Sequence, residues 1–134
     1  MSRLHAMLYE FSGGRFVSRW FAGAPVMVLK TVGRRSARER STPVLYLRDG
    51  DALVVLAANA GADRAPAWWL NLCQAGAAEV VIGRKHIRVR PRELTGPERE
   101  RLWRAFVDMY PQAEDYTRFT DREMPLIVLE PVST

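Results

Sequence analysis

The sequence predicts an α+β fold in which a small antiparallel β-barrel carries helices on one side and at one end. Short apolar, β-branched segments recur along the chain with turn residues between them, as in strands joined by hairpins. Helical spacing of apolar residues is confined to three stretches. The length of 134 residues suits one domain, which we place over residues 1–134.

The first 21 residues predict an amphipathic N-terminal helix over 1–21, interrupted at Gly13-Gly14. Its apolar positions are Leu4, Met7, Leu8, Phe11, Phe16, Val17, Trp20 and Phe21. Three roles are open for this helix. It packs against the barrel, closes over a bound small molecule, or makes a peripheral contact with a membrane, where Trp20 and Phe21 are natural wedges.

Six strands follow from the apolar pattern. We expect them at residues 26–32, 42–48, 52–58, 78–83, 86–94 and 125–130. The third, ALVVLAA, is apolar throughout, as in a strand buried on both faces. Asp49-Gly50 supplies the hairpin turn before it, because Asp-Gly readily adopts positive φ. In the fifth strand, Ile87 and Val89 alternate with polar residues, which predicts one buried face.

Two helices are expected in the second half of the chain. Pro66 opens the first, AWWLNLCQ, and Gly76 closes it. Thr95 and Glu98 have the spacing of a capping box, which predicts the start of a second helix that runs to about Tyr110. A polar helix or loop then leads to the last strand.

Composition excludes several kinds of site. The one cysteine, Cys73, allows no disulfide framework, and in the apolar stripe of its helix it is expected to be an inert core thiol. His5 and His86 lie far apart without carboxylates at ligand spacing, so no metal site built by the protein is expected. The apolar runs are too short to span a bilayer and the N-terminus does not resemble a signal peptide, which predicts a cytoplasmic protein.

The net charge of +5 predicts an anionic partner, and four arginines within TVGRRSARERSTPVLYL (31–47) concentrate that charge. A hairpin turn needs no such cluster, whereas guanidinium groups suit phosphate and carboxylate oxygens. Three interpretations are open: a solvated turn, a nucleic-acid site, or a site for a phosphorylated cofactor. Nucleic acid is disfavoured because no aromatics are interleaved with the arginines and no recognition motif is present.

Three segments resemble signatures of a known family. VGRRSARERSTPV, AANAGADRAPAWWLNL and MYPQAEDYTRFTDREMP are similar, in order and spacing, to the deazaflavin-dependent nitroreductase and quinone reductase family. Its members are small split β-barrels that bind reduced coenzyme F420. The resemblance runs from Pro25 to Pro131. It implies a mainly antiparallel, FMN-binding-like split β-barrel over 25–131, with an N-terminal helix, a short cofactor-side helix and a C-terminal helical segment before the last strand.

The resemblance also assigns the cofactor site by position. Arg34, Arg35 and Arg40 would hold the phosphate and acidic tail of F420, with Arg38 facing water between them. The other implied cofactor residues are Pro43, Ala57, Ala58, Asn59, Gly61, Pro66, Trp68 and Asn71. The backbone after the third strand would lie along the deazaflavin ring and offer it N–H donors. F420 is the expected cofactor, and FMN is the less favoured one.

Tyr110 and Tyr116 match two family tyrosines that flank the electron acceptor, and they are the expected catalytic residues. For Tyr110 the alternative is a place in the apolar face of its helix. The sequence departs from the family at Ala37, where glycine is frequent, at Ala58, where serine is frequent, and at Ala113, where the best-known member has a third tyrosine.

The implied function is hydride transfer from reduced F420 to a quinone or other planar conjugated acceptor. The alternative is a non-catalytic protein that sequesters the deazaflavin, or another anionic amphiphile, in the same cleft. The expected partner is a small-molecule acceptor and not nucleic acid, and the chain is expected to be a monomer or a homodimer.

Overall fold

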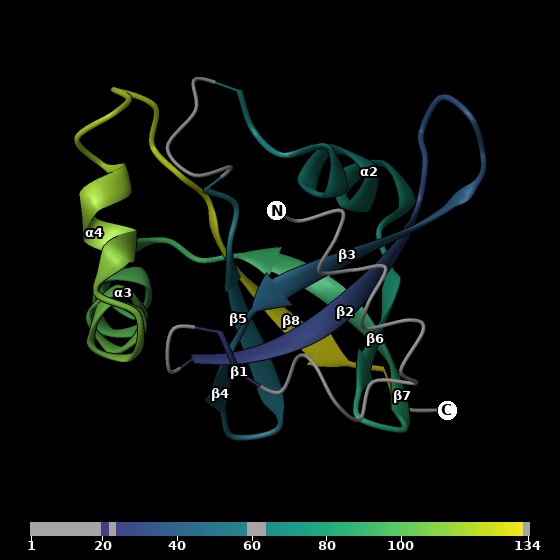
Figure 1. Cartoon of the computed structure of the whole chain (residues 1–134), viewed down its shortest axis with the longest axis horizontal. Helices are drawn as coiled ribbons and strands as arrows, with labels where there is room; N and C mark the ends of the chain where they lie inside the picture. The colour runs from purple at the N-terminus through teal and green to yellow at the C-terminus, as the bar shows by residue number, and fades with distance from the viewer. Residues whose placement is uncertain (1–19, 22–23, 59–63, 133–134) are drawn as a thin grey trace.

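A computed structural model describes residues 20–21, 24–58 and 64–132, which form one curled β-sheet with three helices (Figure 1). The strands are β1 (Trp20–Phe21), β2 (Ala24–Val32), β3 (Glu39–Leu45), β4 (Leu47–Asp49), β5 (Ala52–Leu56), β6 (Ala78–Ile82), β7 (Lys85–Glu93) and β8 (Leu126–Pro131). The helices are α2 (Ala67–Ala75), α3 (Gly96–Met109) and α4 (Gln112–Tyr116).

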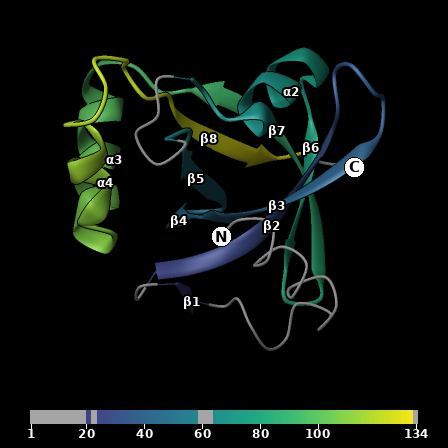
Figure 2. The ribbon, with the colours of Figure 1, turned by 45° about the horizontal axis from the view of Figure 1, so that its top comes forward.

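The strand order in the sheet is β1-β2-β6-β7-β8-β5-β4, with β3 paired to β2. Every pairing between the described strands is antiparallel. Figures 1 and 2 show α3 and α4 together on one side of the sheet, while α2 lies near the loop that joins β2 to β3. The expected α+β class is confirmed, and the curled antiparallel sheet is consistent with a split barrel.

β5 and β8 are buried on both faces because they separate two hydrophobic clusters. Leu53 and Val55 face the first cluster, which is built from β2, β5, β6, β7, β8 and α2. Val54, between them, faces the second cluster, in which α3 and α4 pack on β5 and β8. β8 alternates in the same way, with Ile127 in the first cluster and Val128 in the second. This two-sided burial explains the apolar runs over residues 52–56 in β5 and 126–129 in β8.

The second expected strand, over 42–48, divides at Tyr46. β3 begins earlier, at Glu39, because its ladder with β2 extends as far as Val32. At Tyr46 the chain changes its partner. The Tyr46 N–H donates to the carbonyl of Pro25 at 3.1 Å, and β4 then pairs with β5.

Most of the expected N-terminal helix, residues 1–19, lies outside the described residues. The expected last turn of this helix was wrong, because Trp20 and Phe21 form β1 and pair with the start of β2. Pairing opposite Pro25 and Ala24 gives this backbone partners in the sheet. The membrane contact expected of that helix stays a prediction. No helix within the described ranges is long and apolar enough to cross a membrane.

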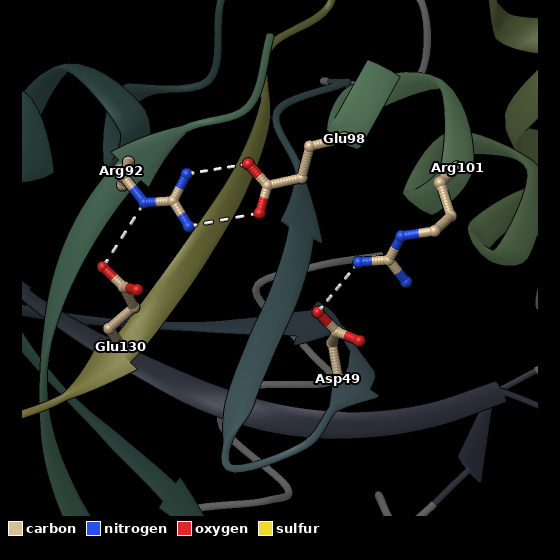
Figure 3. Close-up of polar contacts among 5 residues, drawn as sticks. All are labelled: Asp49, Arg92, Glu98, Arg101 and Glu130. Carbon is tan, nitrogen blue, oxygen red and sulfur yellow. Dashed lines mark hydrogen bonds and ion pairs between the residues drawn. The ribbon is translucent and has the colours of Figure 1, made fainter. Parts of the chain in front are cut away.

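The start of α3 is where the sequence predicts it, but the expected capping box does not form. Thr95 is the N-cap and its side chain makes no capping hydrogen bond. The Glu98 carboxylate instead accepts two hydrogen bonds from Arg92, at 2.9 and 3.3 Å, and Arg92 also pairs with Glu130 at 3.5 Å (Figure 3). A bidentate, charge-assisted contact with a guanidinium is stronger than a bond to one backbone N–H, so Glu98 joins α3 to β7.

α2 begins after Pro66 and ends before Gly76, which has the left-handed φ of 74° expected of a helix C-cap. The helix turns Trp68 and Asn71 toward the sheet. Cys73 lies about 140° round the helix from Trp68 and is exposed, so the expectation of a core thiol was wrong.

Phe106 tests the packing of α3 on the sheet. Its side chain is 2% exposed within the second cluster, so Phe106→Ala is expected to lower the free energy of unfolding by about 3–5 kcal/mol. Phe119 is 70% exposed and is the matched control. Phe119→Ala should change the free energy of unfolding by less than about 0.5 kcal/mol. Urea unfolding of both variants measures the difference, and equal losses would contradict this assignment of the core.

Candidate functional site

A cavity of about 570 Å³ lies between the β2–β3 loop and α2, and we call it the arginine cavity. Its lining includes Thr31, Arg34, Arg35, Arg40, Trp68 and Asn71. Figures 1 and 2 place the loop and α2 at the same end of the molecule, away from α3 and α4. The structure therefore gathers five of the expected cofactor residues around one space, together with Thr31.

The loop over 33–38 closes on itself through its backbone. The N–H of Gly33 donates to the carbonyl of Arg38 at 2.8 Å, and the N–H of Ala37 donates to the carbonyl of Gly33 at 2.8 Å. A Cβ on Gly33 would lie 2.6 Å from the Ser36 hydroxyl, so glycine allows this close approach. Ala37 has a φ of 58°, in the left-handed region that favours glycine. The tight turn limits where its arginines reach.

Asn71 anchors the loop to α2. Its side chain is 5% exposed, and its Oδ1 accepts from the backbone N–H of Arg34 at 3.1 Å and from the Arg34 Nη1 at 2.9 Å. A guanidinium has five N–H donors, so this contact leaves others for a ligand. The amide therefore fixes the Arg34 side chain at the cavity before any ligand binds.

The lining of the arginine cavity has one sign of charge. Arg34, Arg35 and Arg40 contribute guanidinium groups, and no aspartate or glutamate is among the described residues that line it. Arg38 is exposed and does not line the cavity. Three cations around one space favour an anion between them, and guanidinium groups match the geometry of phosphate and carboxylate oxygens.

Thr31 adds a buried polar group to this wall. The residue is 2% exposed, and its Oγ1 has no hydrogen-bond partner among the described residues. Thr31 continues the face of β2 that places Met27 and Leu29 in the first cluster, and it lies opposite Arg40 in the ladder. Thr31 was not among the site residues expected from the sequence, although period-two alternation along β2 predicts that it points inward.

Because the Thr31 hydroxyl is unpaired among the described residues, we expect it to lower the stability of the ligand-free protein. Thr31→Val keeps the shape and removes an unsatisfied buried group, so the free energy of unfolding should rise by about 1 kcal/mol. Thr42→Val, on the same cavity and only half-buried, is the control and should change it by less than about 0.5 kcal/mol. Urea unfolding without added ligand checks both. A loss of stability in Thr31→Val would show that its hydroxyl has a partner.

A second cavity, of about 500 Å³, lies between α3 and the segment before β8. Arg99 and Arg122 line it, but so do Glu100, Asp121 and Glu123. Because the charges of this second cavity are mixed, the arginine cavity is the better candidate for an anionic ligand.

The expected ring-side residues Ala57 and Ala58 follow β5 and are buried, but they do not line the arginine cavity. The N–H of Ala57 donates to the carbonyl of Pro125 at 2.9 Å, so this group already has a partner, and the place of Ala57 beside the cofactor ring stays a prediction. The carbonyls of Ala57 and Ala58 accept from the Arg122 guanidinium at 3.2 and 2.9 Å. Arg122 was also missed from the sequence, because no local signal predicts a contact across 64 and 65 positions.

The other expected cofactor residues are spread more widely. Pro66 is buried as the N-cap of α2. Pro43 lies in β3 opposite Val28, outside the lining of the arginine cavity. Asn59 and Gly61 lie outside the described residues.

The expected catalytic tyrosines lie beside each other at the α3–α4 junction, away from the arginine cavity. Their hydroxyls are 2.9 Å apart, and the ring centroids of Tyr110 and Tyr116 are 6.3 Å apart. Tyr110 is 4% exposed within the second cluster, and Tyr116 packs against that cluster. Burial of the Tyr110 hydroxyl, and then its hydrogen bond with Tyr116, raise the pKa of Tyr110. Tyr110 is therefore protonated at neutral pH.

The raised pKa of Tyr110 predicts how stability depends on pH. Above about pH 10 the unfolded chain releases this proton while the folded chain keeps it, so the free energy of unfolding should fall as pH rises. Tyr110→Phe removes the titrating group and should weaken that fall. Urea unfolding of both proteins between about pH 8 and 11 measures it. Parallel losses in wild type and variant would contradict the prediction.

The curled sheet is the fold of split-barrel reductases. A solved F420-H2 dependent reductase, FDR-A, superposes with a TM-score of 0.72 at 29% identity, over 79% of this chain and 94% of that one. A solved domain-swapped dimer superposes with a TM-score of 0.74 at 26% identity, over 96% of each chain.

The sequence comparisons define the family. The model of the F420H(2)-dependent quinone reductase family matches residues 1–131. An F420H(2)-dependent quinone reductase of Mycobacterium tuberculosis is 33% identical over an alignment of 132 positions that covers 95% of this chain and 87% of that protein. The chain therefore belongs to the F420H(2)-dependent quinone reductase family. Membership makes it an oxidoreductase of that type and implies coenzyme F420 as its cofactor, as the sequence signatures predicted.

The residues of the arginine cavity fit the anionic part of F420. The three guanidinium groups provide donors for a phosphate and for carboxylates. The Thr31 hydroxyl is a further donor whose hydrogen-bonding capacity is unused among the described residues.

Proposed function

We propose that this chain reduces a quinone, or another planar conjugated acceptor, with F420H2, and that the arginine cavity holds the phosphate and acidic tail of the cofactor. The observation that supports the proposal is the gathering of three arginine side chains, with no carboxylate in the described lining, in a member of an F420-dependent family.

Each cavity residue has a distinct part in this proposal. Arg34, held by Asn71, is the pre-oriented donor, and Arg35 and Arg40 supply the remaining charge. Trp68 is 8% exposed and belongs both to the first cluster and to the cavity wall, so it offers an apolar surface beside the charged one. The combination suits a ligand that is planar at one end and anionic at the other.

When bound, reduced F420 supplies the hydride. The protein has to position the acceptor, exclude water and provide hydrogen-bond donors. We assign the acceptor side to Tyr110 and Tyr116, whose hydroxyls share a hydrogen bond. The Tyr110 hydroxyl stays protonated at neutral pH because its pKa is raised. Ala113 is fully buried in the same cluster and has no hydroxyl, which favours a quinone over a nitroaromatic as acceptor.

A turnover assay tests the activity. Purified protein is incubated with F420H2 and menadione, and cofactor oxidation is followed by its absorbance. We expect oxidation that depends on both protein and quinone. Tight cofactor binding without oxidation across a panel of quinones would instead favour a sequestering protein.

A double substitution tests the anion site. Arg34→Ala with Arg35→Ala removes two charge-assisted hydrogen bonds of about 1.5–3 kcal/mol each, so the affinity for oxidised F420 should fall by roughly two to four orders of magnitude. Fluorescence titration measures the affinity, and a melting curve confirms folding.

Arg38→Ala is the matched control, because Arg38 belongs to the same loop but does not line the cavity. It should change the affinity by less than about threefold. If the control loses as much affinity as the double variant, or the double variant binds like wild type, the assignment of this cavity is wrong.

A further inference from the structure

Arg122 lies in the segment between α4 and β8, and its side chain reaches the end of β5. Its Nη1 donates to the carbonyl of Ala57 at 3.2 Å and its Nη2 to the carbonyl of Ala58 at 2.9 Å. The carbonyl of Pro125, in the same segment, accepts from the N–H of Ala57 at 2.9 Å. Three hydrogen bonds thus join this segment to two consecutive residues after β5.

These contacts begin where the β-ladder stops. The pairing of β5 with β8 ends at Leu56 opposite Leu126, so the next carbonyls of the chain have no strand beside them. Ala57 is fully buried and Ala58 is 7% exposed, and buried carbonyls need partners. The half-buried Arg122 guanidinium donates hydrogen bonds to both carbonyls from one planar group, which fixes the orientation of two peptide groups at once.

The peptide between Ala57 and Ala58 has a second polar end. The described peptide bonds are all trans, and in a trans peptide the N–H points opposite to the carbonyl. The Ala58 N–H therefore points away from Arg122, and no acceptor for it is found among the described residues. Because a charged donor on the carbonyl polarises the whole peptide, it also strengthens this N–H as a donor.

We propose that Arg122 is a positioning residue for the cofactor: by holding the Ala57 and Ala58 carbonyls it directs the Ala58 N–H at a carbonyl oxygen of the bound deazaflavin ring. The proposal rests on the proposed function, since it takes F420 as the ligand. It assigns the ring contact to Ala58, because the N–H of Ala57 is already bonded to Pro125. The loss of a side-chain hydroxyl at Ala58 leaves this backbone contact unaffected.

The Ala58 amide can be observed directly in the wild-type protein. In ¹H–¹⁵N spectra, oxidised F420 should move the Ala58 amide proton downfield, as expected of a new hydrogen bond, while inorganic phosphate alone should not. An Ala58 amide that stays in place, while the Arg34 amide shifts on F420 addition, would overturn the proposal and leave the anion site standing.

Substitution of Arg122 tests the positioning. Arg122→Met should weaken the binding of oxidised F420 by about tenfold and return its bound absorbance spectrum toward that of the free cofactor. Arg122→Lys keeps the charge but cannot bridge two carbonyls in one plane, so its affinity should lie between those of wild type and Arg122→Met.

Arg118→Met is the matched control, because Arg118 belongs to the same segment, is exposed and pairs only with Asp115, at 3.9 Å, among the described side chains. It should leave both affinity and spectrum unchanged. If Arg122→Met melts earlier but binds F420 with wild-type affinity and spectrum, its role is structural alone and the inference fails. If wild type itself does not bind F420, the proposed function fails and this inference with it.

Discussion

The burial of β5 and β8 on both faces is the constraint on which the rest of this structure depends. One face of each strand completes the first cluster with α2, and the other supports α3 and α4. Because these strands pair with each other, the segments that follow β5 and precede β8 must lie side by side. Ala57 and Arg122 meet for that reason.

The arginine cavity destabilises the ligand-free protein, in contrast to the core. Three guanidinium groups repel one another, Thr31 has an unpaired buried hydroxyl, and Ala37 adopts a φ that costs an alanine of order 1 kcal/mol. Strain and unsatisfied polarity of this kind gather at functional sites, where a ligand compensates for them. The buried Asn71 amide limits the cost, because it holds the loop and the Arg34 side chain together.

The elements that the sequence predicted well depend on local physics. The start of β5, the turn at Gly50 and the ends of α2 need only neighbouring residues, and all lie where expected. The errors fall where a distant group competes. Glu98 binds Arg92 instead of capping α3, and Tyr46 divides a strand because it bonds the start of β2.

The sequence by itself determined the fold class, the family and the concentration of charge in one loop, because periodicity, turn residues and signature spacing are all local properties. It also pointed to Arg34, Arg35 and Arg40 as a group. The tertiary structure alone decided that α2 supplies the opposite wall of their cavity and that Tyr110 and Tyr116 lie elsewhere. It alone brought Arg122 to the end of β5. Contacts between segments tens of residues apart depend on how the sheet curls, and no local pattern records that geometry.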